Sequence, residues 1–304
     1  MHDMNRPDNK NIFTQPAAIV LLALLTCCLW GSAFPAIKKG FILFHIEDTG
    51  SQILFAGYRF FLAGMLTLVT IKTSSIPSIF MQGILQTTIQ YVCFYIGLSN
   101  TTGAKGSVIN GSNAFFSIIA AHFMTKNEKM SLKEVLGCMI GFTGVIVVNL
   151  NGEGFADGFS FMGEGLILLC SISYGISSVT LKKISDKETP NAITAYQLLF
   201  GGAVLILIGG MTGGHVGGFT FVSSLLLLYL SLISTITFCL WANLLKYNPI
   251  GKISIFGFSI PVFGVLMSAI FLGENAITVT TVSALLFVSI GIIIVNKNQK
   301  ADID

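Results

Sequence analysis

Residues 29–39 of the chain read LWGSAFPAIKK, and residues 173–183 read SYGISSVTLKK. The two stretches align without a gap: Trp30 falls on Tyr174, a glycine follows each aromatic residue, and both stretches end in a pair of lysines. A plain apolar run has no need of an aromatic residue, small residues and a lysine pair in this order. The likeness therefore predicts an internal repeat.

Three further pairs of stretches match in the same order and at a nearly constant offset. They are residues 53–64 with 191–202, 104–128 with 251–275, and 141–149 with 288–296. Chance can supply one match between apolar segments, but four in the same order indicate two copies of one unit.

The composition places both copies in a membrane. The 304 residues are 53% hydrophobic and only 10% charged, with a mean hydropathy of +0.80. A soluble domain carries about 25% charged residues, so this chain has too little polar surface to stay in water. The six cysteines all lie in apolar stretches and match no metal-binding or redox spacing, so neither a metal nor a cofactor is predicted.

A membrane helix needs about 20 mostly apolar residues, and ten stretches meet that length. The predicted spans are 17–37, 51–71, 76–98, 104–124, 132–150, 161–181, 191–211, 220–244, 253–272 and 277–296. The expected domains are an N-terminal tail (1–16), a first repeat (17–150), a second repeat (161–296) and a C-terminal tail (297–304).

Basic residues predict how the spans are oriented, because they collect on the cytoplasmic side of a membrane. With a cytoplasmic N-terminus, thirteen Lys and Arg lie inside and only Lys38, Lys39 and Lys105 lie outside. Both termini are therefore expected in the cytoplasm of a cell that carries the protein in its inner or plasma membrane.

Each copy holds five spans, and an odd number inverts the second copy relative to the first. Inverted repeats are typical of secondary transporters, which bind their substrate near mid-membrane between the copies. The predicted fold is an all-α integral membrane protein with ten transmembrane helices, arranged as two inverted five-helix repeats around a central cavity.

The order of these motifs resembles the EamA family of the drug/metabolite transporter superfamily. The likeness rests on LWGSAFPAIK, on GYRFFLAG in the second span, and on the paired segments that begin KNEKMSLKEV and LGENAITVTT. It implies a ten-helix bundle that exports small metabolites such as amino acids, drugs, sugars or nucleotide-sugars. Family members often carry a proline in the fourth helix, where this chain has Asn113.

Charged residues within the spans are candidates for the substrate site. Arg59 stands near the middle of the second span, where an arginine costs from ~3 to over ~10 kcal/mol unless it faces protein or water. It either anchors the substrate or bonds backbone carbonyls of broken helices. Lys105 and Lys252 are repeat counterparts that either neutralise an anionic substrate or extend along lipid to reach water.

Polar and aromatic residues complete the predicted site. Gln86 and Gln90 belong to a glutamine stripe with a spacing of four on the third span, which either lines a wet cavity or bonds neighbouring helices. Asn110 and Asn113 on the fourth span likewise either line the cavity or bond neighbouring helices. The remaining candidates are the aromatic residues Trp30, Tyr174 and Trp241 as cavity walls or gates, and Pro35 and Pro261 as hinges.

The predicted function is export of a small polar metabolite, most simply an amino acid or related zwitterion, by alternating access. The alternatives are a carrier of anionic organophosphates or nucleotide-sugars and a membrane scaffold or receptor. No catalytic motif such as GxSxG or HExxH occurs, so an enzyme is not expected. The expected partners are a small-molecule substrate and the lipid bilayer, with no nucleic acid. The small residues of GCMIG (137–141) predict close helix packing, either within a protomer or between the protomers of a homodimer.

Overall fold

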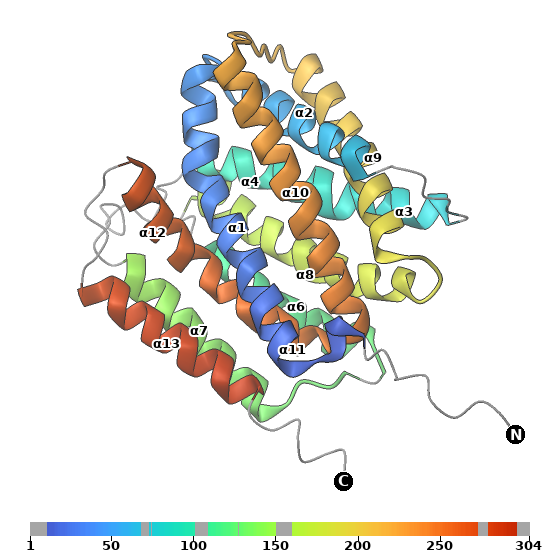
Figure 1. The fold of residues 1–304 in the computed structure, drawn as a ribbon, viewed down its shortest axis with the longest axis vertical. Coiled ribbons are helices and arrows are strands. Elements are labelled where there is room, and N and C mark those ends of the chain that lie inside the picture. The colour runs from blue at the N-terminus through green and yellow to red at the C-terminus, as the bar shows by residue number, and fades with distance from the viewer. Residues whose placement is uncertain are drawn as a thin grey trace, which may run out of the picture.

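The apolar stretches of the sequence form helices, and the described residues contain no strand. The computed structural model describes residues 11–67, 73, 75–100, 109–126, 128–149, 160–272 and 279–296 (Figure 1). The elements are η1 (Ile12–Thr14), α1 (Pro16–Leu43), α2 (Thr49–Thr67), α3 (Ile76–Gly83), η2 (Ile84–Ile89), α4 (Gln90–Ser99), α6 (Asn113–Met124), α7 (Leu132–Asn149), η3 (Phe161–Gly165), α8 (Leu166–Ser185), α9 (Pro190–Met211), α10 (Phe221–Tyr247), α11 (Ile250–Ser254), η4 (Ile255–Phe258), α12 (Ser259–Leu272) and α13 (Val279–Asn296).

The first helix is longer than the sequence predicts. α1 has 28 residues and ends at Leu43, although the predicted span ends at residue 37. About 20 apolar residues are enough to cross the hydrocarbon of a membrane, but a helix can continue beyond the hydrocarbon. Pro35 does not end α1, and the chain turns after Leu43, where His45 has a φ of 53°.

Four of the predicted spans depart from regular α-helix, and one of them, the sixth, begins with the π-helical segment η3. The third has a π-helical turn, η2, between α3 and α4, and the ninth has a 3-10 segment, η4, between α11 and α12. In the fourth span, residues 109–111 are helical, Ser112 forms a turn, and α6 begins at Asn113. Parts of the predicted second and fourth spans, residues 68–71 and 104–108, lie outside the described residues.

Two helix pairs flank the bundle. α2 packs along α9, and α7 packs along α13, on opposite sides of a centre that α1 and α10 cross (Figure 1). Behind α1 and α10 lie α4, α6 and α8. α1 also packs against α12, and α6 packs against α8.

Successive long helices run in alternate directions across the bundle. The end at which α1 begins is called the amino end here, and the other is called the far end. Asn248, which follows α10, donates a hydrogen bond to the carbonyl oxygen of Phe13 (2.8 Å), so α10 ends at the amino end. α8 also ends there, and α11 begins there.

The outer surface of the bundle is strongly apolar. Large side chains are exposed on many helices, among them Leu21 (68%), Met139 (62%) and Phe221 (83%). Continuous apolar surface of this kind marks contact with a membrane or another protein. Among the described residues, four helices have the length and composition to cross a membrane: Pro16–Leu43, Phe161–Ser185, Pro190–Met211 and Phe221–Tyr247.

Candidate substrate cavity

A cavity opens where the interrupted helices meet the centre of the bundle. It contains about 880 Å³ of empty space, part of it open to the outside. Its lining residues are Trp30, Ala33, Phe34 and Ile37 of α1, Arg59 of α2, Gln90, Tyr91 and Phe94 of α4, Asn110, Gly111, Asn113 and Ala114 at the start of α6, Tyr174 of α8, Phe238 of α10, and Ser254, Gly257, Ile260 and Pro261 of α11 to α12.

The cavity brings together seven of the residues that the sequence predicts for the site. They are Trp30, Arg59, Gln90, Asn110, Asn113, Tyr174 and Pro261. They come from both copies of the repeat, so the walls need both halves of the chain. Mostly apolar walls with a few polar groups are typical of a small-molecule site.

Arg59 supplies the positive charge of the cavity wall. Its residue is only 2% exposed, and its Nε donates a hydrogen bond to Ser234 Oγ (2.9 Å) on α10. Its guanidinium carbon lies 5.0 Å from the centre of the Phe60 ring. In the described part of the chain, no carboxylate forms an ion pair with this guanidinium.

Neutral polar groups lie elsewhere on the same wall. Gln90 Oε1, Asn113 Oδ1 and Ser254 Oγ are buried and have no hydrogen-bond partner among the described residues. Asn113 Nδ2 donates to Asn110 Oδ1 (3.2 Å), which joins the two predicted asparagines. Because a side-chain amide offers an oxygen or an NH₂ group, these residues can accept from or donate to a ligand.

Aromatic side chains form the apolar part of the lining. Trp30 meets Phe238 edge-on, with ring centres 5.9 Å apart, and Tyr91 and Phe94 stand together on α4 (6.3 Å). The ring of Tyr174 completes the wall from α8. An apolar side chain of a bound molecule would lie against these rings.

The hinge candidates differ in their surroundings. Pro261 lacks the N–H that would bond the carbonyl of Gly257 four residues earlier, and the 3-10 segment η4 ends three residues before it. Pro35 is buried within α1, which continues on both sides of it, and it does not line the cavity. At the repeat counterpart of Pro261, the turn at Ser112 interrupts the helix without a proline, and the Ser112 hydroxyl donates to the carbonyl of Ile109 (2.5 Å).

Three predicted residues are placed away from the lining. Gln86 lies one turn closer to the amino end than Gln90 and accepts a hydrogen bond from Gln82 Nε2 (2.7 Å). Trp241 is 2% exposed and packs behind Trp30, with ring centres 5.1 Å apart. Lys252 is half-buried on α11, one turn from the amino end. Lys105 lies outside the described residues.

The sequence reasoning missed several lining residues. Phe34, Ile37 and Phe238 are apolar, and an apolar residue in a membrane span gives no signal of whether it faces lipid, a neighbour or a cavity. Phe238 lies three residues before Trp241 and one helical turn away, which is the one local indication that it shares the aromatic face. Ser254 stands two residues after Lys252 in the predicted ninth span and was not singled out.

Comparison with known proteins supports two copies of one unit in the chain. The model of the EamA-like transporter family matches residues 17–150 and again residues 161–297. An uncharacterized transporter of Bacillus subtilis, YvbV, is 26% identical over 93% of this chain and 92% of its own length. A probable amino-acid metabolite efflux pump of Escherichia coli is 25% identical over 84% of this chain and 87% of its own length.

A solved crystal structure has the same fold. It superposes with a TM-score of 0.78 at 15% sequence identity and covers 91% of this chain and 98% of that chain. At this identity the likeness concerns the arrangement of the helices alone.

Proposed function

Because the chain belongs to the EamA-like transporter family, we propose that it exports amino acids or related zwitterions by alternating access. The family and the relatives make the chain a metabolite transporter with a non-enzymatic role and multiple apolar helices. The substrate class, the direction and the mechanism are the proposal.

The main support for a zwitterion is the position of Arg59. Its buried guanidinium has no carboxylate partner among the described residues, and it faces the same cavity as the amides of Gln90 and Asn113. A carboxylate would bind the guanidinium, and an ammonium would bind amide and hydroxyl oxygens. The aromatic wall leaves space for an apolar side chain. Two relatives named as probable amino-acid metabolite efflux pumps point to the same class.

The described lining favours a single anionic group on the substrate. An organophosphate or nucleotide-sugar carries more negative charge, and the sequence offers Lys105 and Lys252 to neutralise it. Lys252 lies outside the cavity lining, which leaves Arg59 as the one cationic side chain among the described lining residues.

Symmetry-related contacts support the two inverted repeats. An added Cβ at Gly31 of α1 would lie 2.6 Å from Phe263 Cβ on α12, and one at Gly175 of α8 would lie 2.6 Å from the backbone of Phe116 on α6. The repeat aligns Gly31 with Gly175 and Phe116 with Phe263. The same close approach therefore occurs twice, once with the glycine in the first copy and once with the glycine in the second. The α2–α9 and α7–α13 pairs join repeat counterparts as well.

The proposal places the amino end of the bundle in the cytoplasm of the cell. The thirteen basic residues that the sequence assigns to the cytoplasm include Lys182, Lys246 and Lys252, which lie near that end. The cavity then lies in the middle and far half of the bundle, because its lining reaches Ile37 and Phe94 near the far ends of α1 and α4.

The proposal is tested with purified protein in liposomes. We expect labelled amino acids to bind and to cross the liposome membrane. We expect Arg59→Gln to weaken binding by about 10- to 100-fold, because a hydrogen bond to a charged group contributes about 1.5–3 kcal/mol. Lys252→Gln is the matched control, since it removes a cation that does not line the cavity, and it should leave binding nearly unchanged.

Three results would contradict parts of the proposal. Binding without flux would leave the protein a receptor instead of a carrier. Loss of transport in Lys252→Gln, together with flux of organophosphates, would favour the anionic alternative. Unchanged binding in Arg59→Gln would remove that residue from the site.

A further inference from the structure

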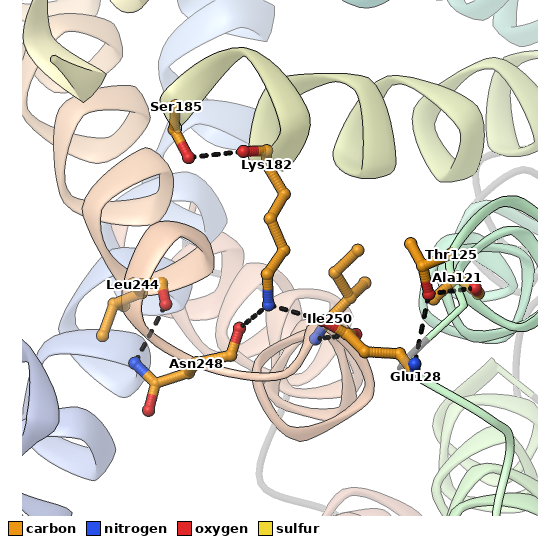
Figure 2. Close-up of polar contacts among 8 residues, drawn as sticks. All are labelled: Ala121, Thr125, Glu128, Lys182, Ser185, Leu244, Asn248 and Ile250. Carbon is orange, nitrogen blue, oxygen red and sulfur yellow. Dashed lines mark hydrogen bonds and ion pairs between the residues drawn. The ribbon is translucent and has the colours of Figure 1, made fainter. Parts of the chain in front are cut away.

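Three segments that are far apart in the sequence meet at the amino end of the bundle (Figure 2). Lys182, in the last turn of α8, forms an ion pair with Glu128 Oε1 (2.5 Å) on the connector between α6 and α7. The same ammonium donates to the carbonyl oxygen of Asn248 (2.5 Å) on the connector between α10 and α11. The second carboxylate oxygen, Glu128 Oε2, accepts from the backbone N–H of Ile250 (2.7 Å). These four residues are called the clasp.

The clasp is held in place from each side. Asn248 Nδ2 donates to the carbonyl oxygens of Leu244 (2.9 Å) and Phe13 (2.8 Å), which fixes its connector to α10 and to the segment before α1. The backbone N–H of Glu128 donates to Thr125 Oγ1 (3.3 Å). The side chains of Lys182 and Glu128 are 24% and 17% exposed, so water screens the pair less than it screens an exposed one.

The clasp joins the two family-matched halves of the chain. Glu128 belongs to the first matched segment, residues 17–150, and the other three residues of the clasp belong to the second, residues 161–297. The cavity is also built from both segments. Any motion that opens the cavity toward the amino end by separating the α10–α11 connector from α6 and α8 must break these contacts.

One face of α8 leads from the cavity to the clasp. Tyr174, Ser178 and Lys182 are spaced by four residues and so lie on the same side of the helix. Tyr174 lines the cavity, Ser178 is only 1% exposed, and Lys182 forms the ion pair. The buried stretch at Ser178 therefore separates the cavity from the amino end. The clasp lies on the side of this stretch that faces the amino end.

We propose that the clasp is the lock that keeps the amino end closed while the cavity is accessible from the far end. This inference rests on the proposed function, since it assigns the lock of an alternating-access cycle. Breaking the ion pair shifts the population toward the state that is open at the amino end.

The test measures how readily a thiol reagent reaches the buried stretch. Ser178→Cys introduces a probe of similar size, and the labelling of its peptide by a maleimide is followed by mass spectrometry, which separates it from the native cysteines. Adding Lys182→Gln should raise the labelling rate about tenfold, which corresponds to about 1.4 kcal/mol. The matched control is Lys183→Gln, because Lys183 is the next residue, is exposed and lies outside the clasp. It should leave the rate unchanged.

Two further variants separate the lock from a loss of folding. Glu128→Gln keeps an oxygen for the Ile250 N–H and removes only the charge, so it should raise labelling with little change in the thermal unfolding temperature. Lys182→Arg keeps the positive charge and the N–H donors for Glu128 and Asn248, so it should preserve most of the protection. Equal labelling in Lys182→Gln and Lys183→Gln would overturn the proposal.

The labelling test needs no substrate, so its outcome is independent of which metabolite is carried. Increased labelling in the clasp variants supports the lock even where no amino acid crosses the liposome membrane, and that second result would refute only the proposed substrate. Flux of amino acids with unchanged labelling would refute the lock alone.

Discussion

Gln86 and Gln90 are the same residue type one helical turn apart, and the fold gives them different surroundings. Gln90 lines the cavity, and its Oε1 has no partner among the described residues. Gln86 is 3% exposed and accepts from Gln82 Nε2, which also donates to the carbonyl oxygen of Ser177 (3.1 Å) on α8. Gln90 thus faces the cavity, whereas Gln86 bonds Gln82, and it is Gln82 that joins α3 to α8.

This difference predicts separate effects of one substitution at the two positions. Gln90→Leu should weaken amino-acid binding by about tenfold while the unfolding temperature changes little, because a lost hydrogen bond costs about 0.5–1.5 kcal/mol. Gln86→Leu should lower the unfolding temperature and leave binding nearly unchanged, since it removes one of the two acceptors of Gln82 Nε2. Equilibrium binding and thermal unfolding of both variants measure the two effects. Equal loss of binding in both would place the two amides in one site.

The sequence identifies residues whose chemistry is out of place in lipid. Arg59, Gln90 and Asn113 are polar within apolar spans, and each faces the cavity because lipid would leave its polar groups unpaired. The clasp could not be predicted in this way. Glu128 and Lys182 stand 54 residues apart near the ends of their helices, where charged residues are ordinary. In the sequence Lys182 is only one of the lysine pair that ends the second repeated stretch, whereas the structure gives it an ion pair.

At the scale of an element, the two prolines of the predicted hinges have opposite effects on their helices. α1 continues through Pro35 over its full 28 residues. The 3-10 segment Ile255–Phe258 ends three residues before Pro261, where the carbonyl of Gly257 would otherwise receive a helical hydrogen bond. An added Cβ at Gly257 meets nothing within 4 Å, so this segment borders open space.

We therefore expect Pro261→Ala to slow the carrier. Alanine restores the missing N–H and favours a regular helix through η4, which should raise the unfolding temperature and lower the maximal rate of flux in liposomes. Pro35→Ala is the matched control and should have the smaller effect on the rate, because α1 is already continuous. A larger loss of flux in Pro35→Ala would move the hinge to α1.

Helix positions follow from hydropathy, whereas the breaks within helices do not. Residues 84–89, ILQTTI, contain neither glycine nor proline, yet they form a π-helical turn. The cause is tertiary: Ser173 Oγ on α8 donates to the carbonyl oxygen of Leu85 (2.7 Å), and Thr88 Oγ1 donates to that of Gly201 (3.4 Å) on α9. Contacts between distant segments decide such turns, and a single sequence does not contain them.

At the scale of the whole molecule, α2 and α9 form a seam between the two halves. An added Cβ at Gly209 would lie 2.6 Å from the backbone nitrogen of Leu54, and one at Gly64 would lie 2.5 Å from that of Leu199. Backbones approach this closely only where side chains are absent, as in other membrane helix pairs. The adjacent Gly210 is exposed and has nothing within 4 Å of an added Cβ.

Substituting alanine at each of these two neighbouring glycines should distinguish the effect of packing on stability from the effect of helix propensity. Gly209→Ala is expected to lower the free energy of unfolding by about 1–3 kcal/mol, because the seam must widen. Gly210→Ala should leave it unchanged or raise it by up to about 1 kcal/mol, as alanine favours helix over glycine. Thermal unfolding in one detergent compares them. Equal free energies of unfolding for the two variants would mean that α2 and α9 can move apart without loss of stability.

The length of α1 has a consequence for the position of its lysines in the bilayer. Its 28 residues span about 42 Å, whereas the hydrocarbon of a typical bilayer is about 30 Å thick. Lys38 follows Pro16 by 22 positions, about 33 Å along the helix axis. Lys38 and Lys39 are exposed, and if α1 enters the hydrocarbon at Pro16, their ammonium groups lie beyond the acyl chains of a bilayer of that thickness. The thickness of the surrounding bilayer thus sets how far α1 must tilt.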